Sequence, residues 1–283
     1  MSTFKEIKKR INAIKSTRKT TSAMKMVSSS KLNKAESVTS AMSPYSEEIR
    51  RILNSMLTSD YACLLSLERP VQRVAIIAFS SDSSLCGAYN SNISHVLQKR
   101  VSTYKKSLDD DQIYVYTIGK KVYEFTKKTK IPVTKNFEDL AGKTDYPTVA
   151  NLATSLIEKF ENKQLDRVEL IYHHFKSAGS QELVTKQLLP IKLPEQEQQT
   201  VDYIIEPSHD AILKALIPKS IKLQVYTALL NANASEHAAR MIAMQTATDN
   251  ADDLVGELTI EYNKSRQQAI TNELLDLIGG SAK

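Results

Sequence analysis

The sequence predicts an α/β protein in which one α/β domain is inserted between two long terminal helices that pair as an antiparallel coiled coil. Residues 3–58 and 219–278 each have the pattern of a single long helix. The residues between them alternate β-rich runs with amphipathic helical runs, as in a layered α/β domain. The chain also has only seven glycines among 283 residues, where average composition gives about 20. Few glycines mean few tight turns and long continuous elements.

The N-terminal helix, residues 3–58, opens with a capping-box pattern from Thr3 to Glu6, whose hydroxyl and carboxylate can satisfy free amides of the first turn. We expect Pro44 to kink or locally break this helix. After an irregular middle, seam positions recur at steps of three and four residues. This heptad spacing is typical of a helix that packs against a partner helix: Leu32, Ala35, Thr39, Met42, Ser46, Ile49, Leu53 and Met56.

The central segment has four strand patterns and two amphipathic helices. Pro147 is suited to the first turn of the second helix, and residues 195–200 form a polar loop. Alternation of this kind predicts a largely parallel sheet covered by helices. The strands are residues 71–79, 112–119, 167–175 and 181–191, and the helices are 88–106 and 147–163.

The C-terminal helix can be capped by Ser208, and Pro218 is expected to interrupt it near its start. From 219 to 278 it is about 90 Å long at 1.5 Å per residue. Since the terminal helices are the only long elements, we expect them to pair. The chain then divides into an N-terminal helix, 1–60, an inserted α/β domain, 70–206, and a C-terminal helix, 208–283. The C-terminal seam is rich in alanine, so a partner helix can approach closely: Ala228, Ala232, Ser235, Ala239, Ile242, Ala243, Ala247, Ala251, Leu254 and Leu258.

The positive charge is concentrated at the N-terminus. Residues 1–34 hold ten Lys or Arg and one acid, a net charge of +9, so the remainder carries −3 of the total of +6. This asymmetry predicts an acidic partner for the N-terminal helix. No apolar run is long enough to span a membrane, so no direct membrane insertion is expected. The two cysteines, Cys63 and Cys86, are expected to be free thiols in a reducing compartment.

No constellation of residues indicates catalysis. Residues 81–90 lie where a phosphate loop would lie, between a strand and a helix, but contain one glycine and neither glycine-rich nucleotide motif. His173 and His174 are adjacent on a strand, so they point to opposite faces and cannot chelate one ion. Hydrolase and zinc-protease motifs are missing from the sequence. We therefore expect no catalytic, metal-binding or cofactor-binding residues, and no enzyme activity of the chain's own.

Both ends of the chain resemble one family. Residues 7–36, IKKRINAIKSTRKTTSAMKMVSSSKLNKAE, and residues 235–280 closely resemble the terminal signatures of the γ subunit of F-type ATP synthases of bacterial type. The turn SSDSSLCGAYN, 80–90, resembles the start of the family's inserted domain. Ser83 and Ser84 depart from it, because the family commonly has Arg-Gly there, so contacts of that arginine do not carry over. MSPYSEE, 42–48, and DYIIEP, 202–207, resemble segments near the family's foot.

The resemblance implies a Rossmann-like inserted domain and a non-catalytic central shaft. Such a shaft rotates within a hexamer of three α and three β subunits, rests on the membrane ring of c subunits, and also binds an ε subunit. It couples proton-driven rotation of the c-ring to ATP synthesis or hydrolysis at the β subunits. No cofactor and no nucleic acid is implied. Because Met1 opens the helix without a presequence, we expect a peripheral protein on the cytoplasmic face of a bacterial inner membrane.

The resemblance also assigns roles to residues. It places the stretch 20–31 in the bore of the hexamer, with Ala23, Met24 and Val27 packed toward the partner helix. Coupling to the β subunits is expected from Met24, Lys25, Arg240, Arg266, Gln267 and Thr271. Residues of the foot near the c-ring are expected to be Pro44, Tyr45, Tyr203 and Glu206.

Other functions remain open from the residues alone. A basic coiled-coil scaffold or a nucleic-acid-binding protein fits the basic helix, but Phe4 is the only aromatic residue before Tyr45, and single-strand binding sites usually add aromatics for stacking. An enzyme on the α/β insert lacks a motif. A membrane-surface helix needs a broader apolar face than this one. Co-purification with α and β subunits separates these alternatives from a shaft.

Overall fold

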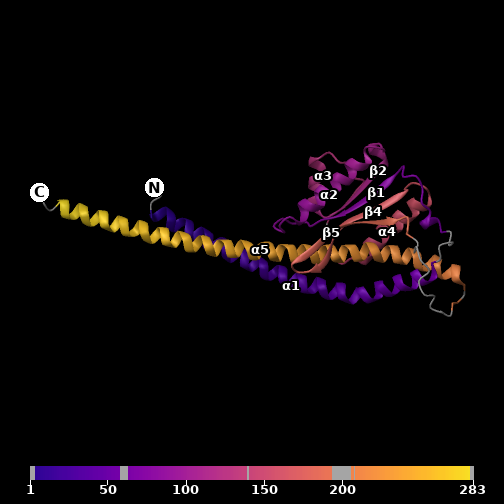
Figure 1. The fold of residues 1–283 in the computed structure, drawn as a ribbon, viewed down its shortest axis with the longest axis horizontal. Coiled ribbons are helices and arrows are strands. Elements are labelled where there is room, and N and C mark those ends of the chain that lie inside the picture. Colours follow the sequence, from indigo (N-terminus) through magenta and orange to yellow (C-terminus); the bar gives the residue numbers. More distant parts are fainter. Residues whose placement is uncertain (1–3, 58–62, 139, 193–204, 207, 281–283) are drawn as a thin grey trace. The chain divides into compact units, whose positions relative to one another are not determined.

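The computed structural model describes residues 4–57, 63–138, 140–192, 205–206 and 208–280. They form two compact units, one drawn from residues 1–29 and 240–283 and the other from residues 30–239. Two helices contribute to both units: α1, Phe4–Met56, and α5, His209–Gly280 (Figure 1). The predicted pair of long terminal helices around an α/β domain is confirmed.

The unit of residues 30–239 is built on a five-stranded sheet of order β3-β2-β1-β4-β5. The first four strands in this order are parallel to their neighbours, and β5 is antiparallel to β4. The four predicted strands are confirmed. Strand β3 was missed because three residues are too short for a periodic pattern. The strands are β1 Val74–Phe79, β2 Ile113–Ile118, β3 Lys135–Phe137, β4 Arg167–Ser177 and β5 Ser180–Leu189.

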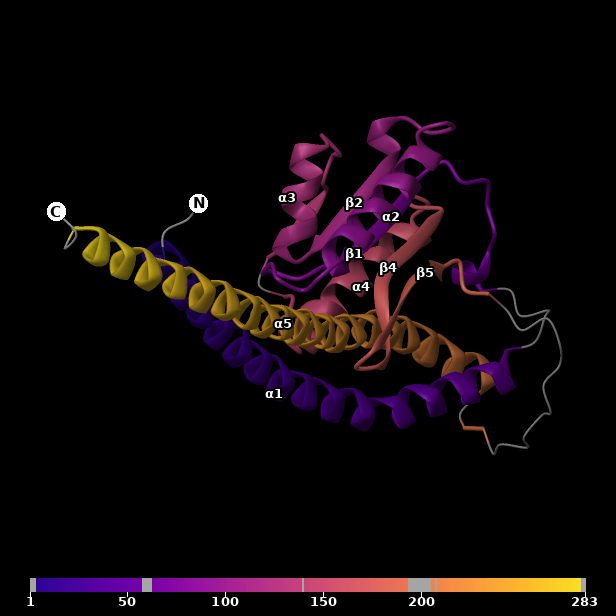
Figure 2. The ribbon, with the colours of Figure 1, turned by 60° about the vertical axis from the view of Figure 1, so that its left-hand side comes forward.

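Helices cover both faces of this sheet, as in a Rossmann-like domain. On one face the core is formed with α2, Tyr89–Tyr104, and α3, Lys120–Lys128. On the other it is formed with α4, Tyr146–Glu161, and with parts of α1 and α5 (Figure 2). Two short 3-10 helices, Leu64–Ser66 and Asp110–Gln112, lie in the connections.

Neither proline in the long helices ends its helix. Pro44 lies inside α1 and Pro218 inside α5, so the expected local break at Pro44 and interruption at Pro218 are wrong. The alternative expectation, a kink at Pro44, stays a prediction. Each proline removes one helical hydrogen bond, but α5 is held on both sides of Pro218 by Ile217 and Ile221, which are 2% and 0% exposed. The start of α5 is capped as predicted, because the Ser208 hydroxyl accepts the Ala211 N–H at 3.3 Å. The predicted capping box at Thr3 lies outside the described residues.

The heptad seam of α1 is confirmed within this unit. Leu32, Ile49, Leu53 and Met56 are buried, and the remaining seam positions are half-buried. On α5 the alanine-rich positions Ala228, Ala232 and Ser235 are buried as well. Cys86 is buried and Cys63 is half-buried, and neither of these two thiols is joined in a disulfide bond.

Four residues of the α5 stretch 231–235 are hydrogen-bonded to three segments of the α/β domain. The Asn231 side chain accepts the Phe175 N–H at 3.2 Å, and the Asn233 side chain accepts the Gly142 N–H at 3.0 Å. The Ser235 hydroxyl donates to the His173 carbonyl at 3.1 Å. The Tyr89 hydroxyl donates to the Ala232 carbonyl at 3.0 Å. We call this region the α5 clamp.

His173 makes this unit sensitive to acid. It is 3% exposed and its ring stacks on Tyr89 with centroids 4.5 Å apart. Burial lowers the pKa of His173 from 6.5 to about 4. Between pH 6.5 and 4, the unfolded chain therefore binds a proton at His173 that the folded chain does not bind. The stabilisation is fully present above pH 6.5 and is lost as the pH falls through 4.

We expect the free energy of unfolding to fall by about 3 kcal/mol between pH 6.5 and 4 because of this one group. His173→Phe keeps an aromatic ring against Tyr89 and is expected to remove most of the dependence. Urea unfolding at a series of pH values measures it, with the exposed His95→Gln as the matched control. If the free energy of unfolding of His173→Phe falls between pH 6.5 and 4 as much as that of the wild type, His173 is not the group responsible.

Candidate functional site

The second unit is an antiparallel coiled coil, which we call the terminal coiled coil: residues 4–29 of α1 with residues 240–275 of α5. Ile7 and Ile11 pack on Leu258, and the rings of Phe4 and Tyr262 lie 6.5 Å apart. Further along, Arg18 pairs with Asp252 at 2.8 Å. Partners with rising numbers on α1 have falling numbers on α5, so the predicted antiparallel pairing is confirmed.

The seam of the terminal coiled coil changes from apolar to hydroxyl-bearing residues. Thr21 and Ser28 are 9% and 3% exposed. The hydroxyl oxygens of Thr21 and Thr248 are 2.7 Å apart and share a hydrogen bond across the seam. The Ser28 hydroxyl donates to the Met24 carbonyl at 2.8 Å. Each of these buried hydroxyls thus has a partner, as burial of a polar group requires.

This arrangement corrects the expected packing of the stretch 20–31. Ala23 is exposed and Val27 is 57% exposed, so they face away from the partner helix, while Met24 is half-buried. On α5, Ile242 and Leu254 were expected in the seam, but each is 45% exposed. On α1 the expectation followed apolar residues, whereas the helix follows heptad spacing. On α5 the expected heptad was in the wrong register at these two positions, because the heptad steps of buried and half-buried residues run through Met244, Thr248, Ala251, Val255 and Leu258.

The heptad was in fact present in the sequence. Steps of four and three from Ile7 run through residues 11, 14, 18, 21, 25 and 28 and reach Leu32, where the recognised seam begins. The register therefore continues through the stretch that looked irregular, and only the side-chain chemistry changes. This spacing was the signal that could have located Thr21 and Ser28.

The cross-seam hydrogen bond gives a prediction. Thr21→Val alone is expected to cost about 1 kcal/mol, because it deprives Thr248 of one of its partners. The change of both Thr21 and Thr248 to Val is expected to cost clearly less than the sum of the two single changes. A double-mutant cycle on urea unfolding of the full chain measures this coupling.

The matched control uses Thr17→Val and Thr246→Val. Both hydroxyls are exposed and bond only carbonyls of their own helices, those of Ala13 and Ile242. They should show additive effects. Additive effects at Thr21 and Thr248 as well would contradict a hydrogen bond across the seam.

The outer surface of the terminal coiled coil carries many exposed apolar side chains. Met26 and Ile260 are 69% and 73% exposed. Exposed apolar surface of this extent usually marks contact with another protein. The other exposed members are Val27, Ile242, Leu254, Ile270, Leu274 and Leu275. Basic residues lie among them on α1, including exposed Lys8, Lys9 and Arg10.

The expected coupling residues lie at two levels of the terminal coiled coil. Arg266, Gln267 and Thr271 are exposed, beyond Tyr262, which is the partner of the first described residue of α1. The Thr271 hydroxyl donates to the Gln267 carbonyl at 2.9 Å, so it has lone pairs left to accept from a partner. The structure thus brings these three residues together near the end of α5.

The remaining coupling residues lie elsewhere. Met24 and Lys25 are half-buried close to Thr21, whose partner Thr248 is 18 residues before Arg266, about 27 Å along α5. Arg240 is only 8% exposed. The expected set therefore consists of two groups of residues and one buried arginine.

The expected foot residues that the structure describes belong to the unit of residues 30–239. Pro44 is exposed and Tyr45 is 43% exposed. The Lys219 ammonium lies 5.4 Å from the Tyr45 ring centroid, and a hydrogen bond to Tyr45 raises the pKa of Lys219. Glu206 is exposed, and Tyr203 lies outside the described residues.

The turn at residues 81–90 is filled by its own side chains. The Asn90 amide donates to the Ser81 hydroxyl at 2.8 Å and its oxygen accepts the Ser81 N–H at 3.1 Å. Nearby, a Cβ on Gly119 would lie 2.2 Å from the Ser80 carbonyl oxygen. Among the described residues, no group of three or more His, Cys, Asp or Glu could hold a metal ion. The described helices include none that is long and apolar enough to cross a membrane.

Paired terminal helices with an exposed apolar and basic outer surface, together with a largely parallel α/β domain, define an α/β protein with a terminal coiled coil that is suited to contact with another protein. The family model described as ATP synthase matches residues 3–282. The chain is 50% identical to the ATP synthase gamma chain of Bacteroides fragilis and 46% identical to that of Bacteroides thetaiotaomicron, and each alignment covers 99% of both chains. The chain belongs to the ATP synthase γ-chain family.

A solved structure supports the fold. A chain in the Euglena gracilis mitochondrial ATP synthase, in the structure of its OSCP/F1/c-ring in rotational state 3, is similar with a TM-score of 0.70 at 20% identity. The similarity covers 99% of the present chain and 93% of the Euglena chain. At this identity it bears on the fold alone.

Proposed function

We propose that this chain is the central shaft of a rotary ATP synthase and performs no chemistry itself. Its terminal coiled coil turns within a hexamer of three α and three β subunits. Its α/β domain rests on the membrane ring of c subunits, together with an ε subunit. Rotation of the c-ring turns the shaft, and the shaft drives the β subunits through their catalytic states. The observation that carries the proposal is the outer surface of the terminal coiled coil.

That surface suits a rotating contact. Met26 and Val27 are exposed on α1, and apolar side chains of this kind, methionine above all, adapt to many surfaces without a fixed geometry. The basic residues of α1 attract acidic loops over distances of about 10 Å at ordinary ionic strength. Exposed lysines keep their hydration, so they favour proximity without fixing one rotational position.

The residue-level assignments follow from this function. Arg266, Gln267 and Thr271 contact a loop of a β subunit and bear torque, while Met24, Lys25 and Arg240 contribute to coupling at a second level. Pro44, Tyr45, Tyr203 and Glu206 belong to the foot above the c-ring. We propose the same division into functional segments, 1–60, 70–206 and 208–283, and a location on the cytoplasmic face of the bacterial inner membrane.

Reconstitution with α and β subunits of a bacterial relative tests the function. We expect the chain to co-purify with them in a ratio of one to three to three. With the hexamer fixed to a surface and a probe attached to the α/β domain, ATP hydrolysis is expected to rotate the probe. A stable complex whose probe stays still during turnover, or preferential purification with nucleic acid, contradicts a shaft.

A further inference from the structure

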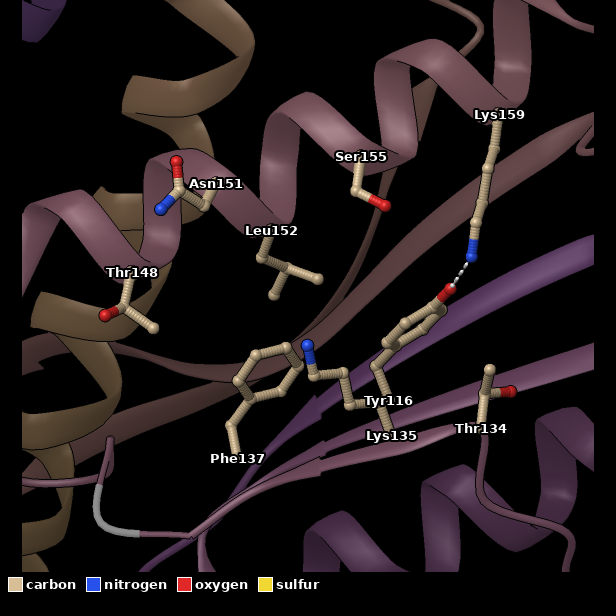
Figure 3. A pocket seen from close by; sticks show the side chains of 9 residues that line it. All are labelled: Tyr116, Thr134, Lys135, Phe137, Thr148, Asn151, Leu152, Ser155 and Lys159. Carbon is tan, nitrogen blue, oxygen red and sulfur yellow. Dashed lines mark hydrogen bonds between the residues drawn. The ribbon is translucent and has the colours of Figure 1, made fainter.

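A polar groove lies between α4 and the edge of the sheet at β2 and β3. It encloses about 480 Å³, which is within the range of about 300–1,000 Å³ usual for small-molecule sites. We call it the α4 groove. Figure 3 shows the side chains that line it: Tyr116, Thr134, Lys135, Phe137, Thr148, Asn151, Leu152, Ser155 and Lys159.

The charge of the α4 groove has one sign. Two of the nine lining residues are lysines and none is acidic. Lys159 comes from α4 and Lys135 from β3, so their ammonium groups enter the groove from opposite walls (Figure 3). Thr134, Asn151 and Ser155 add hydroxyl and amide groups that are exposed to solvent.

Both lysines are held by aromatic rings. The Lys159 ammonium donates to the Tyr116 hydroxyl at 3.0 Å and lies 5.6 Å from the centroid of that ring. The Lys135 ammonium lies 5.0 Å from the Phe137 centroid. Cation–π contacts at exposed sites are weak, whereas hydrogen bonds from ammonium to an anionic oxygen are about twice as strong as neutral ones. An anion that entered the groove would therefore attract both ammonium groups.

A structural role can be given for each lysine by itself, but not for the position of both lysines at one groove. Lys159 is in the last turn of α4, where a cation favours the helix dipole, but its ammonium is directed to Tyr116 on the sheet. Lys135 is on an edge strand, where charge discourages pairing with other chains. Neither role requires the two lysines to face one groove lined by hydrogen-bonding groups.

We propose that the α4 groove binds a small phosphate-bearing anion, with Lys135 and Lys159 contacting the phosphate oxygens. Lysine binds phosphate as a point charge, and two ammonium groups that face one groove match the multiple charge of a phosphate-bearing anion. Thr134, Asn151 and Ser155 supply further hydrogen bonds. The Tyr116 and Phe137 rings offer an apolar surface on which a base could rest. The proposal is independent of the role of the chain as a shaft.

Isothermal titration of the purified full chain with pyrophosphate and with ADP, at low ionic strength, tests the site. We expect saturable binding at one site per chain, weakened by added salt. Lys135→Gln and Lys159→Gln are each expected to weaken binding by roughly tenfold, which is about 1.4 kcal/mol. Tighter binding of ADP than of pyrophosphate supports a nucleoside phosphate, and equal binding supports a ligand recognised through its phosphates alone.

Two further variants test whether binding depends on the groove itself or only on the net charge of the chain. Ser155→Leu keeps both lysines and fills the groove, so it should also abolish binding. The double change Lys99→Gln and Lys106→Gln removes the same charge from two exposed positions, one within α2 and one just beyond its end, on the other face of the sheet, and should leave binding unchanged. The proposal is wrong if neither ligand binds saturably, or if binding survives the combined loss of Lys135 and Lys159.

Discussion

Replacing Arg266, Gln267 and Thr271 together with alanine is expected to lower ATP hydrolysis and synthesis by the assembled complex at least tenfold. Nucleotide binding by isolated β subunits should not change. Residues 267 and 271 share one face of α5, and 266 lies about 100° from 267, so the three form one exposed patch. A hydrogen bond to a charged group contributes about 1.5–3 kcal/mol, so loss of two or three removes several kcal/mol of coupling.

The neighbouring residues of α5 provide a matched control. Lys264, Gln268 and Asn272 are also exposed and offer one basic and two amide side chains, so they match the first set in charge and in hydrogen-bonding capacity. They follow each other at steps of four. Gln268 and Asn272 lie about 60° and 100° round the helix from Thr271, while Lys264 lies one heptad before Thr271 and controls for the loss of charge alone. Their combined change to alanine is expected to leave turnover near the wild-type rate. Steady-state hydrolysis and proton-driven synthesis should be measured for both triple variants. Wild-type rates for the first triple variant would mean that the patch bears no torque.

Arg100→Leu is expected to destabilise the α/β domain by about 3 kcal/mol. Glu169 is 2% exposed on β4, and its carboxylate accepts hydrogen bonds from Arg100 at 2.7 and 3.1 Å and from the Tyr104 hydroxyl at 2.7 Å. Removal of the arginine leaves a buried charge without its counter-ion, which typically costs about 3–5 kcal/mol. Because Arg100 is partly exposed, we expect the lower end of that range.

A second variant tests the physical cause. Changing Arg100 and Glu169 together to leucine removes both charges and is expected to recover most of the lost stability. The exposed pair of Lys105 and Asp110, 2.8 Å apart, serves as the control, and Lys105→Leu should cost less than about 1 kcal/mol. Urea unfolding at neutral pH measures all three. A double variant no more stable than Arg100→Leu would show that packing, and not the unpaired charge, dominates.

Local sequence patterns predicted most of the fold. Alternating strand and helix patterns located β1, β2, β4 and β5, and the heptad located the seam from Leu32 to Met56. Strand β3 was beyond reach, because its three residues are defined by pairing with β2 and not by a period of their own. The predictions at the prolines were wrong for a similar reason, because packing around Pro218 outweighs the local tendency of proline to interrupt a helix.

The candidate site could be predicted only in part. A search for periodic apolar residues misses a seam made of Thr21 and Ser28, because Thr and Ser are usually surface residues. Only their heptad spacing shows that they lie in the seam. The α4 groove could not be found from the sequence. Lys135 and Lys159 belong to different elements and meet Tyr116 only when α4 packs on the sheet, so no short motif records their proximity.

The α5 clamp has a mechanical consequence. A twisting load on the α/β domain would enter α5 within one short stretch, because residues 231–235 accept hydrogen bonds from Tyr89, Gly142 and Phe175 and donate one to His173. From Ser235 to Arg266 the helix continues for 31 residues, about 46 Å. This length of α5 is where elastic strain would accumulate between the point of loading and the patch at its far end. If the chain is the proposed shaft, a twist delivered at the α5 clamp would pass along this helix, since α5 is one uninterrupted element from His209 to Gly280.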